Sequence, residues 1–169
     1  YSYVQTIDSD KRVLLSKANV NSRLVSNIPS EVTILDEENL TLLPKAIKNE
    51  TEVENERIAH IKDGVAVTRF IRWMKETVGK EKITELSAAK KLYQFRSEQE
   101  NFLGDSFDPI IAYGKHAAIV HYSATEETDI PFEARGMVLA DTGGHYLEGS
   151  TDITRTVVLG PVTDKEKKY

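Results

Sequence analysis

The sequence predicts a mixed fold of the α/β (α+β) class. Short apolar runs at residues 13–15 and 32–35 flank a stretch that contains helix-capping residues, which is the pattern of a β-α-β unit. Residues 50–78 repeat apolar side chains at intervals of three and four, as an amphipathic helix does. The last third of the chain has short apolar runs separated by glycine-rich turns, which is typical of paired strands.

The β-α-β pattern comes first along the chain. Asn19 or Asn21 could cap a short helix that runs to Ile28, because Pro29 follows it. This pattern spans only about 35 residues, too few to bury a hydrophobic core alone. The chain also begins at Tyr1 rather than with methionine. We therefore expect this segment to be the tail of a domain whose beginning is missing.

Residues 50–78 predict the longest helix, and Gly79 is expected to end it. His60 lies among charged residues and is expected on the helix surface. The apolar stripe that should face the core comprises Val53, Ile58, Ile61, Val65, Phe70, Trp73 and Met74.

A second helix is predicted from about Thr84 to about Gln99. Thr84 and Ser87 could cap its amino end, although the usual glutamate is absent from the pair. Arg96 could bind an acid, but a solvated helix face is the expected position for it.

Two strands are predicted next, at residues 110–112 and 117–120, with Gly114 in the loop between them. His116 lies in this loop and is expected to be exposed. His121 would end the second, buried strand.

Apolar runs at residues 137–140 and 157–159 predict a further strand pair. Two acidic residues, Asp141 and Asp152, lie between these runs on either side of a glycine-rich turn. Eleven residues of straight strand would separate them by about 36 Å, so the chain must fold back if both serve one site. Gly143, Gly144 and Gly149 are expected to supply the backbone conformations of that reversal.

Two carboxylates in one place repel each other unless one takes up a proton or both share a cation. A divalent metal ion removes this conflict, and oxygen ligands suit magnesium, calcium or manganese. The alternative is that Asp141 and Asp152 only shape turns, as most aspartates beside glycines do. The spacing alone does not decide between the two interpretations.

The surrounding residues resemble a known metal-binding motif. Asp-Thr-Gly-x-x-Tyr at residues 141–146 and Thr-Asp-Ile-Thr-Arg-Thr at residues 151–156 are similar to the metal hairpin of Xaa-Pro aminopeptidases, the aminopeptidase P family of pita-bread metallopeptidases. The resemblance implies that Asp141 and Asp152 are metal ligands. It also implies that His121, twenty residues before Asp141, is catalytic, binding substrate or shuttling a proton. His145 falls at a variable position of the motif and is expected to be exposed or outside the ligand set.

The resemblance implies a domain organisation. Residues 1–43 would be the C-terminal part of a creatinase/prolidase N-terminal-type domain, with the boundary at Pro44. Residues 44–169 would be the truncated first half of the pita-bread catalytic domain. The pair Thr163 and Glu166 is a capping box that announces a helix just before the chain stops at Tyr169. The remaining ligands, one histidine and two glutamates, would follow that point.

The implied activity is release of the N-terminal residue from peptides with proline in second position. The implied cofactors are two divalent metal ions, with manganese favoured over cobalt or zinc. We expect the 169-residue chain to be inactive, because it lacks the other ligands. A prolidase-type Xaa-Pro dipeptidase and a non-catalytic pita-bread binding module stay open as alternatives. Retention of Asp141, Asp152 and His121 argues against the binding module.

Composition excludes several other classes. A net charge of −5 and a pI near 5.5 disfavour nucleic acid as the partner. The absence of cysteine excludes a disulfide framework and a thiolate catalyst. No apolar run approaches the length of a membrane helix and no signal peptide opens the chain, so a cytoplasmic location is expected. The resemblance allows a homodimer.

Overall fold

The computed structural model describes residues 1–168. It divides into two compact units, Tyr1–Lys48 and Asn49–Tyr169, which are described one at a time. The division lies near the boundary predicted at Pro44. Identification of the first unit as part of an N-terminal domain stays a prediction. Among the described residues, no helix combines the length and apolar character that a membrane span needs.

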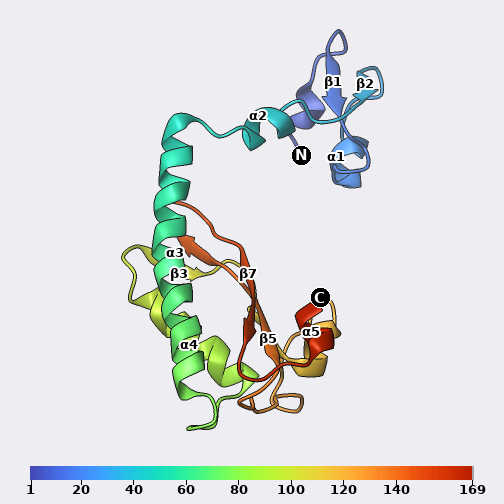
Figure 1. Cartoon of the computed structure of the whole chain (residues 1–169). Coiled ribbons are helices and arrows are strands. Elements are labelled where there is room, and N and C mark those ends of the chain that lie inside the picture. Colours follow the sequence, from blue (N-terminus) through green and yellow to red (C-terminus); the bar gives the residue numbers. More distant parts are fainter. Residues whose placement is uncertain (169) are drawn as a thin grey trace. The chain divides into compact units, whose positions relative to one another are not determined.

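The first unit is a small parallel β-α-β arrangement (Figure 1). Asn21 accepts a hydrogen bond from the backbone N–H of Arg23 and so caps the helix, which confirms one of the two predicted caps. The core of this unit is built on Leu15, Ile28 and Val32. Its elements are η1 (Val4–Thr6), β1 (Arg12–Leu15), α1 (Ser22–Ser26), β2 (Thr33–Asp36) and α2 (Leu42–Ala46).

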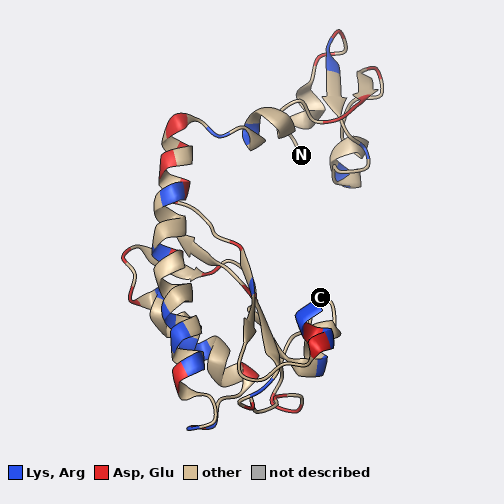
Figure 2. Cartoon of the chain, viewed as in Figure 1, with Lys and Arg blue, Asp and Glu red and all other residues tan. Residues whose placement is uncertain are grey.

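The second unit begins with the long helix α3 (Glu50–Thr77). Asn49 and Glu52 form a reciprocal capping box at its start. Acidic residues gather in this first turn (Figure 2), where they oppose the positive end of the helix dipole. Gly79 follows the helix with a φ of 79°, as predicted.

The buried face of α3 differs from the predicted stripe. Ile61 is 68% exposed, and Val53 and Val65 are also exposed, so these three predictions were wrong. The core contact instead runs along a line that includes Ala59 and Ala66, both fully buried. Their small side chains let neighbouring elements approach the helix closely, which hydrophobic periodicity alone does not reveal.

Helix α4 (Glu85–Ser97) packs against α3. Thr84 and Ser87 exchange side-chain-to-backbone hydrogen bonds at 2.8 and 3.2 Å, so the predicted cap is confirmed and serine takes the place of glutamate in the box.

Five strands form two antiparallel sheets in the second unit. One sheet has the order β4-β5-β7 and the other pairs β3 with β6. The strands are β3 (Phe102–Asp105), β4 (Ile110–Tyr113), β5 (Met137–Thr142), β6 (Gly144–Tyr146) and β7 (Ile153–Val158). The short helix α5 (Asp164–Lys168) follows, with Thr163 and Glu166 joined in the predicted capping box.

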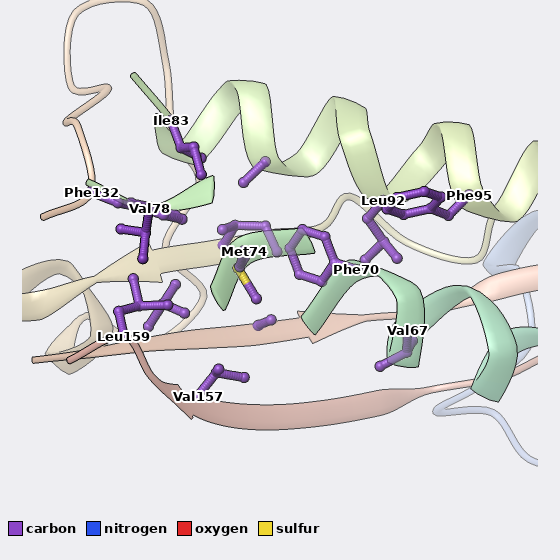
Figure 3. Close-up of a cluster of buried hydrophobic side chains, with 14 of the residues drawn as sticks. Val67, Phe70, Met74, Val78, Ile83, Leu92, Phe95, Phe132, Val157 and Leu159 are labelled. Carbon is purple, nitrogen blue, oxygen red and sulfur yellow. The ribbon is translucent and has the colours of Figure 1, made fainter. Parts of the chain in front are cut away.

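A single hydrophobic core joins α3 and α4 to the sheet β4-β5-β7 (Figure 3). Trp73 packs at its margin against Phe70, with ring centroids 6.0 Å apart, as its predicted core position requires. The buried side chains labelled in Figure 3 are Val67, Phe70, Met74, Val78, Ile83, Leu92, Phe95, Phe132, Val157 and Leu159.

The predicted strand at residues 117–120 is absent from the structure. The chain forms the 3-10 helix η2 (Gly114–Ala118), after which Ile119 is exposed and Val120 is 84% exposed. Within residues 1–168, no strand pairs with this segment. An apolar run becomes a buried strand only where a neighbouring strand satisfies its backbone groups.

Candidate metal centre

Strands β5 and β7 bring the two aspartates of the predicted site to one end of a sheet. Asp141 lies near the end of β5, directly opposite Thr154, and Thr142 lies opposite Ile153. The isolated bridge between His145 and Ser150 continues the same register beyond the ladder. Asp152, which immediately precedes β7, therefore lies opposite Gly143, the residue that follows β5.

This register places both carboxylates on one face. Side chains two residues apart on a strand share a face, so Asp152 lies on the same side as Thr154. Thr154 Oγ1 donates a hydrogen bond of 2.6 Å to Asp141 Oδ1, which puts Asp141 on that side as well. Diagonal neighbours across an antiparallel pair have Cα atoms about 7–8 Å apart. Asp141 is half-buried and Asp152 exposed, so their oxygens are accessible to a cation.

Glycine is required in the hairpin for close approach. A Cβ built at Gly143 would overlap the carbonyl oxygen of Thr151 and the hydroxyl of Ser106. At Gly149 it would overlap the Glu56 carboxylate. Neither residue has a positive φ, and neither does Gly144. The expectation that these glycines supply special backbone conformations was therefore wrong, since their contribution is the missing side chain.

A buried ion pair lies behind the hairpin. Arg96 and Asp63 have no exposed side-chain surface, and the guanidinium Nε and Nη2 donate to the Asp63 carboxylate at 2.7 and 3.1 Å. Arg96 Nη2 also donates to Thr142 Oγ1 at 3.0 Å. Thr151 Oγ1 donates to Asp63 Oδ2, and Tyr146 OH donates to Asp63 Oδ1 at 3.2 Å. The prediction that Arg96 lies on a solvated helix face was wrong, because α4 packs this side chain into the unit.

Burial also changes the acidity of groups around this ion pair. Burial raises the pKa of Asp105 above its ordinary value, and the Arg96 guanidinium opposes only part of that shift. The pKa of Tyr146 is raised by burial first and by the neighbouring Asp63 carboxylate second. The Tyr146 hydroxyl therefore stays protonated at neutral pH and acts as a donor to Asp63.

The tip of the hairpin is fixed by a second ion pair. Lys62 Nζ lies 2.6 Å from Glu148 Oε1, and Asn101 Nδ2 donates to the same oxygen at 2.8 Å. These hydrogen bonds, led by the one from Lys62, lower the pKa of Glu148 to about 2. Glu148 is therefore ionised throughout the neutral range and joins the hairpin to α3.

His121, the predicted catalytic residue, lies in an exposed turn and belongs to no strand. Its φ is 56°, a left-handed conformation that non-glycine residues seldom adopt. Next to it, Tyr122 is buried and its hydroxyl donates to Glu85 Oε2 at 2.7 Å. The Nδ1 atom of His116 lies 3.0 Å from Glu85 Oε1. The expectation that His116 is exposed was thus wrong, because its imidazole contacts the fully buried carboxylate of Glu85.

The described residues do not by themselves form a complete metal site. Within residues 1–168, no group of three or more His, Cys, Asp or Glu side chains is arranged to hold a metal ion. Asp141 and Asp152 share a face, and His121 has no described contact with either. The chemistry of the pair fits a hard or borderline divalent cation, because both donors are carboxylates and Asp141 is oriented by Thr154. His145 and His60 are exposed, as predicted.

The sequence predicts the two aspartates but not the groups that support them. Asp63 carries no motif of its own, and Thr142 and Thr151 are positions of the hairpin motif that were given no role. Asp63 and Thr151 lie 88 residues apart in the chain. The signal that could have identified Asp63 is its position on the buried side of an otherwise apolar helix face, one turn before Ala66 and Val67.

Comparison with known proteins agrees with the resemblance found in the sequence. The chain is 44% identical over 126 residues to a probable Xaa-Pro aminopeptidase P of Paracoccidioides brasiliensis strain Pb03, covering 73% of this chain and 20% of that protein. It is 36% identical over 159 residues to Xaa-Pro aminopeptidase 2 of Sus scrofa, covering 94% and 24%. The chain thus spans about a fifth to a quarter of the length of these relatives.

The fold is likewise that of a known enzyme. The crystal structure of an X-prolyl aminopeptidase from Caenorhabditis elegans, described as a cytosolic enzyme with a di-nuclear active site, superposes with a TM-score of 0.83. The two share 32% sequence identity, and the match covers 91% of this chain and 25% of the nematode chain. The predicted mixed α/β fold of the pita-bread metallopeptidases is confirmed by this match.

The family assignment covers most of the second unit. Residues 54–169 match the sequence profile of metallopeptidase family M24, which is more than half of the chain. The named relatives are Xaa-Pro aminopeptidases, so the resemblance inferred from the hairpin motif is also confirmed. With this profile, these relatives and this fold in agreement, the chain belongs to metallopeptidase family M24.

Proposed function

We propose that these residues form part of a metal-dependent Xaa-Pro aminopeptidase, in which Asp141 and Asp152 are two of the metal ligands. The observation that carries the proposal is the β5–β7 register, which places both carboxylates on one accessible face. Membership of a metallopeptidase family and the di-nuclear centre described for the nematode relative support it. The other ligands would come from the part of the longer protein that the described residues do not include.

Two divalent ions would occupy this centre, and we propose manganese, with cobalt or zinc as alternatives. When bound, such ions supply an activated water and neutralise the charge that develops on the substrate carbonyl. The chain contributes the ligands and their orientation. Asp141 would present to the metal the oxygen that Thr154 does not occupy, and Asp152 would approach the same face from the start of β7.

His121 is the proposed substrate-binding and catalytic residue of this part of the chain. It is exposed and its backbone is held in a left-handed turn, so the imidazole is free to meet a peptide. Burial of the adjacent Tyr122 on Glu85 fixes the turn from behind. The imidazole would donate a hydrogen bond to the substrate carbonyl or the leaving nitrogen.

The proposed substrate is a peptide with proline in second position, as the relatives' names imply. A cytoplasmic location is proposed from the cytosolic nematode enzyme, and a homodimer from the family resemblance. Residues 1–43 are proposed to be the C-terminal part of an N-terminal domain of the creatinase/prolidase type. Structural neighbours also include prolidases, but at 22% identity the likeness to the Bacillus anthracis dipeptidase shows the fold alone.

The test compares metal binding with peptide cleavage. In the full-length protein, Asp141→Ala and Asp152→Ala should each abolish Mn²⁺-dependent release of the first residue from a Xaa-Pro peptide and weaken Mn²⁺ binding in a calorimetric titration. His121→Ala should lose turnover while it keeps Mn²⁺ affinity. The 169-residue chain alone should not cleave the peptide when Mn²⁺ is added, because two carboxylates make an incomplete site.

The outcomes separate the candidate functions. Cleavage of Xaa-Pro dipeptides in strong preference to longer peptides would favour a prolidase-type dipeptidase. Wild-type Mn²⁺ affinity in both aspartate variants would refute the metal site. A full-length protein that binds no metal ion would favour the non-catalytic binding module.

A further inference from the structure

The two carboxylates have neighbours that point the opposite way. Thr142 follows Asp141 and Thr151 precedes Asp152, and alternation along an extended chain turns each threonine away from the carboxylate face. Both threonine side chains are almost completely buried. The position of each carboxylate is therefore coupled, through one backbone unit, to the position of a buried hydroxyl.

Both hydroxyls bind the same ion pair. Arg96 Nη2 donates to Thr142 Oγ1 at 3.0 Å, and Thr151 Oγ1 donates to Asp63 Oδ2. Arg96 and Asp63 are in turn joined by two hydrogen bonds and have no exposed surface. Strand β5, through Thr142, and the segment before β7, through Thr151, are thus both hydrogen-bonded to one ion pair that joins α3 and α4.

A cross-link within the hairpin completes the arrangement. The Thr151 hydroxyl accepts a hydrogen bond of 2.9 Å from the backbone N–H of Gly144. The Thr151 N–H donates to the Gly144 carbonyl at 2.9 Å. Gly143 leaves no space between the two arms, since a Cβ there would overlap the Thr151 carbonyl oxygen. The separation of the arms is fixed at the point where Asp141 and Asp152 emerge.

We propose that Thr142 and Thr151, held by the Asp63–Arg96 ion pair, are positioning residues that set the spacing of the two carboxylates for the metal ions. The proposal rests on the metal-binding role of Asp141 and Asp152 given above. Two metal ions about 3.5–4 Å apart tolerate little variation in the distance between shared carboxylates. Groups that orient metal ligands typically change metal affinity about 10–100-fold when they are removed.

The experiment replaces each threonine by valine, which keeps the shape and removes only the hydroxyl. In the full-length protein, Thr142→Val and Thr151→Val should each weaken Mn²⁺ binding about tenfold or more in a calorimetric titration. Thr151→Ser, which retains the hydroxyl, should restore affinity. Thr33→Val, which removes an exposed hydroxyl from β2 in the first unit, is the matched control and should bind Mn²⁺ like the wild type.

A spectroscopic measurement separates positioning from general stability. Visible absorption of the Co²⁺-loaded protein depends on coordination geometry. It should change in Thr142→Val and Thr151→Val and stay unchanged in Thr33→Val and Thr151→Ser. If Thr151→Val does not fold, as judged by circular dichroism, Thr142→Val carries the test, because it leaves the Asp63–Arg96 contact intact.

The outcomes distinguish this inference from the proposed function. Wild-type affinity and an unchanged Co²⁺ spectrum in both valine variants, with binding lost in Asp141→Ala, would overturn the positioning role alone. Wild-type affinity in Asp141→Ala and Asp152→Ala would overturn the metal site itself.

Discussion

Two acidic side chains with no exposed surface, Asp63 and Glu85, organise the residues around the candidate site. An ionised carboxylate in the interior is stable only when charged or polar donors surround it. Asp63 accepts from Arg96, Tyr146 and Thr151, and so joins α3, α4 and the hairpin. Glu85 lies in the first turn of α4, where the helix dipole favours a negative charge.

Glu85 likewise stabilises the turn that contains His121, through the hydrogen bonds it accepts. It accepts from the backbone N–H of Tyr113 at 2.8 Å and from the Tyr122 hydroxyl at 2.7 Å, and it contacts His116. The segment between β4 and His121 is therefore held at both ends by one carboxylate. The hairpin that carries Asp141 and Asp152 and the turn that carries His121 are each supported by a buried acid from a different helix.

The Lys62–Glu148 ion pair makes stability depend on pH. The pKa of Glu148 is lowered from its ordinary 4.5 to about 2 in the folded protein, so between these values the unfolded chain binds more protons. Stability contributed by this carboxylate is fully present above about pH 4.5 and falls as the pH is lowered toward 2. In urea unfolding, wild type should exceed Glu148→Gln in stability at pH 6, and the difference should shrink as the pH falls to 3.

Glu98 provides the control for this prediction. It pairs with Arg69 on an exposed surface, where an ion pair contributes only about 0–1 kcal/mol. Glu98→Gln should therefore have little effect at pH 6. A Glu148→Gln difference that is the same at pH 6 and pH 3 would show that its ionisation does not stabilise the hairpin.

The sequence predicts the role or burial of some single residues and not of others. The aspartates at positions 141 and 152 were found because a local motif surrounds them. The burial of Arg96 and His116 was not predicted. Each depends on a carboxylate about 30 residues away in the chain, Asp63 for Arg96 and Glu85 for His116. Charged residues are mostly exposed, so the sequence favours the wrong answer for the exceptional buried pair.

At the scale of the elements, the β5–β7 hairpin depends on glycine where its two arms meet. Gly143→Ala should destabilise the protein by about 1–3 kcal/mol, because the added methyl group overlaps the Thr151 carbonyl oxygen and backbone atoms cannot rotate away. Measurement of the free energy of unfolding in urea tests this, together with Mn²⁺ affinity, which should fall as the arms separate.

Gly64 provides a control for which the opposite effect of alanine on stability is expected. It lies inside α3, and a Cβ there meets no atom within 4 Å. Gly64→Ala should stabilise the protein by about 0.5–1 kcal/mol, because alanine restricts the unfolded chain and favours the helix. If Gly143→Ala were as stable as the wild type, the close approach of the arms would not be essential to the hairpin.

Elements with local signals were predicted well. The caps at Asn21, Thr84 and Thr163 are encoded within four residues, and the structure contains each of them. The prediction of a strand at residues 117–120 was wrong, because a strand requires a pairing partner that its own residues cannot specify. The buried face of α3 was predicted only in part for the same reason, since the elements that pack on the helix cover the side with Ala59 and Ala66 and are not specified by the helix's own residues.

At the scale of the whole molecule, residues 1–168 contain two hydrophobic cores, one in each unit. The core of the first unit draws on residues between Val4 and Ile34, and that of the second on residues between Ala66 and Leu159. The first core is built on three buried side chains, Leu15, Ile28 and Val32, in a unit of 48 residues. Units of this size bury little surface and are marginally stable by themselves.

This arrangement predicts that the second unit folds without the first. A chain of residues 49–169 retains the Asn49–Glu52 capping box, every buried residue of its core and the whole Asp63–Arg96 network. Its circular dichroism should show the helices α3 and α4, and its urea transition should be cooperative. Residues 1–48 alone should show no cooperative transition. Loss of helical signal from the 49–169 chain would mean that its core needs the first unit, and the two-core description would then be wrong.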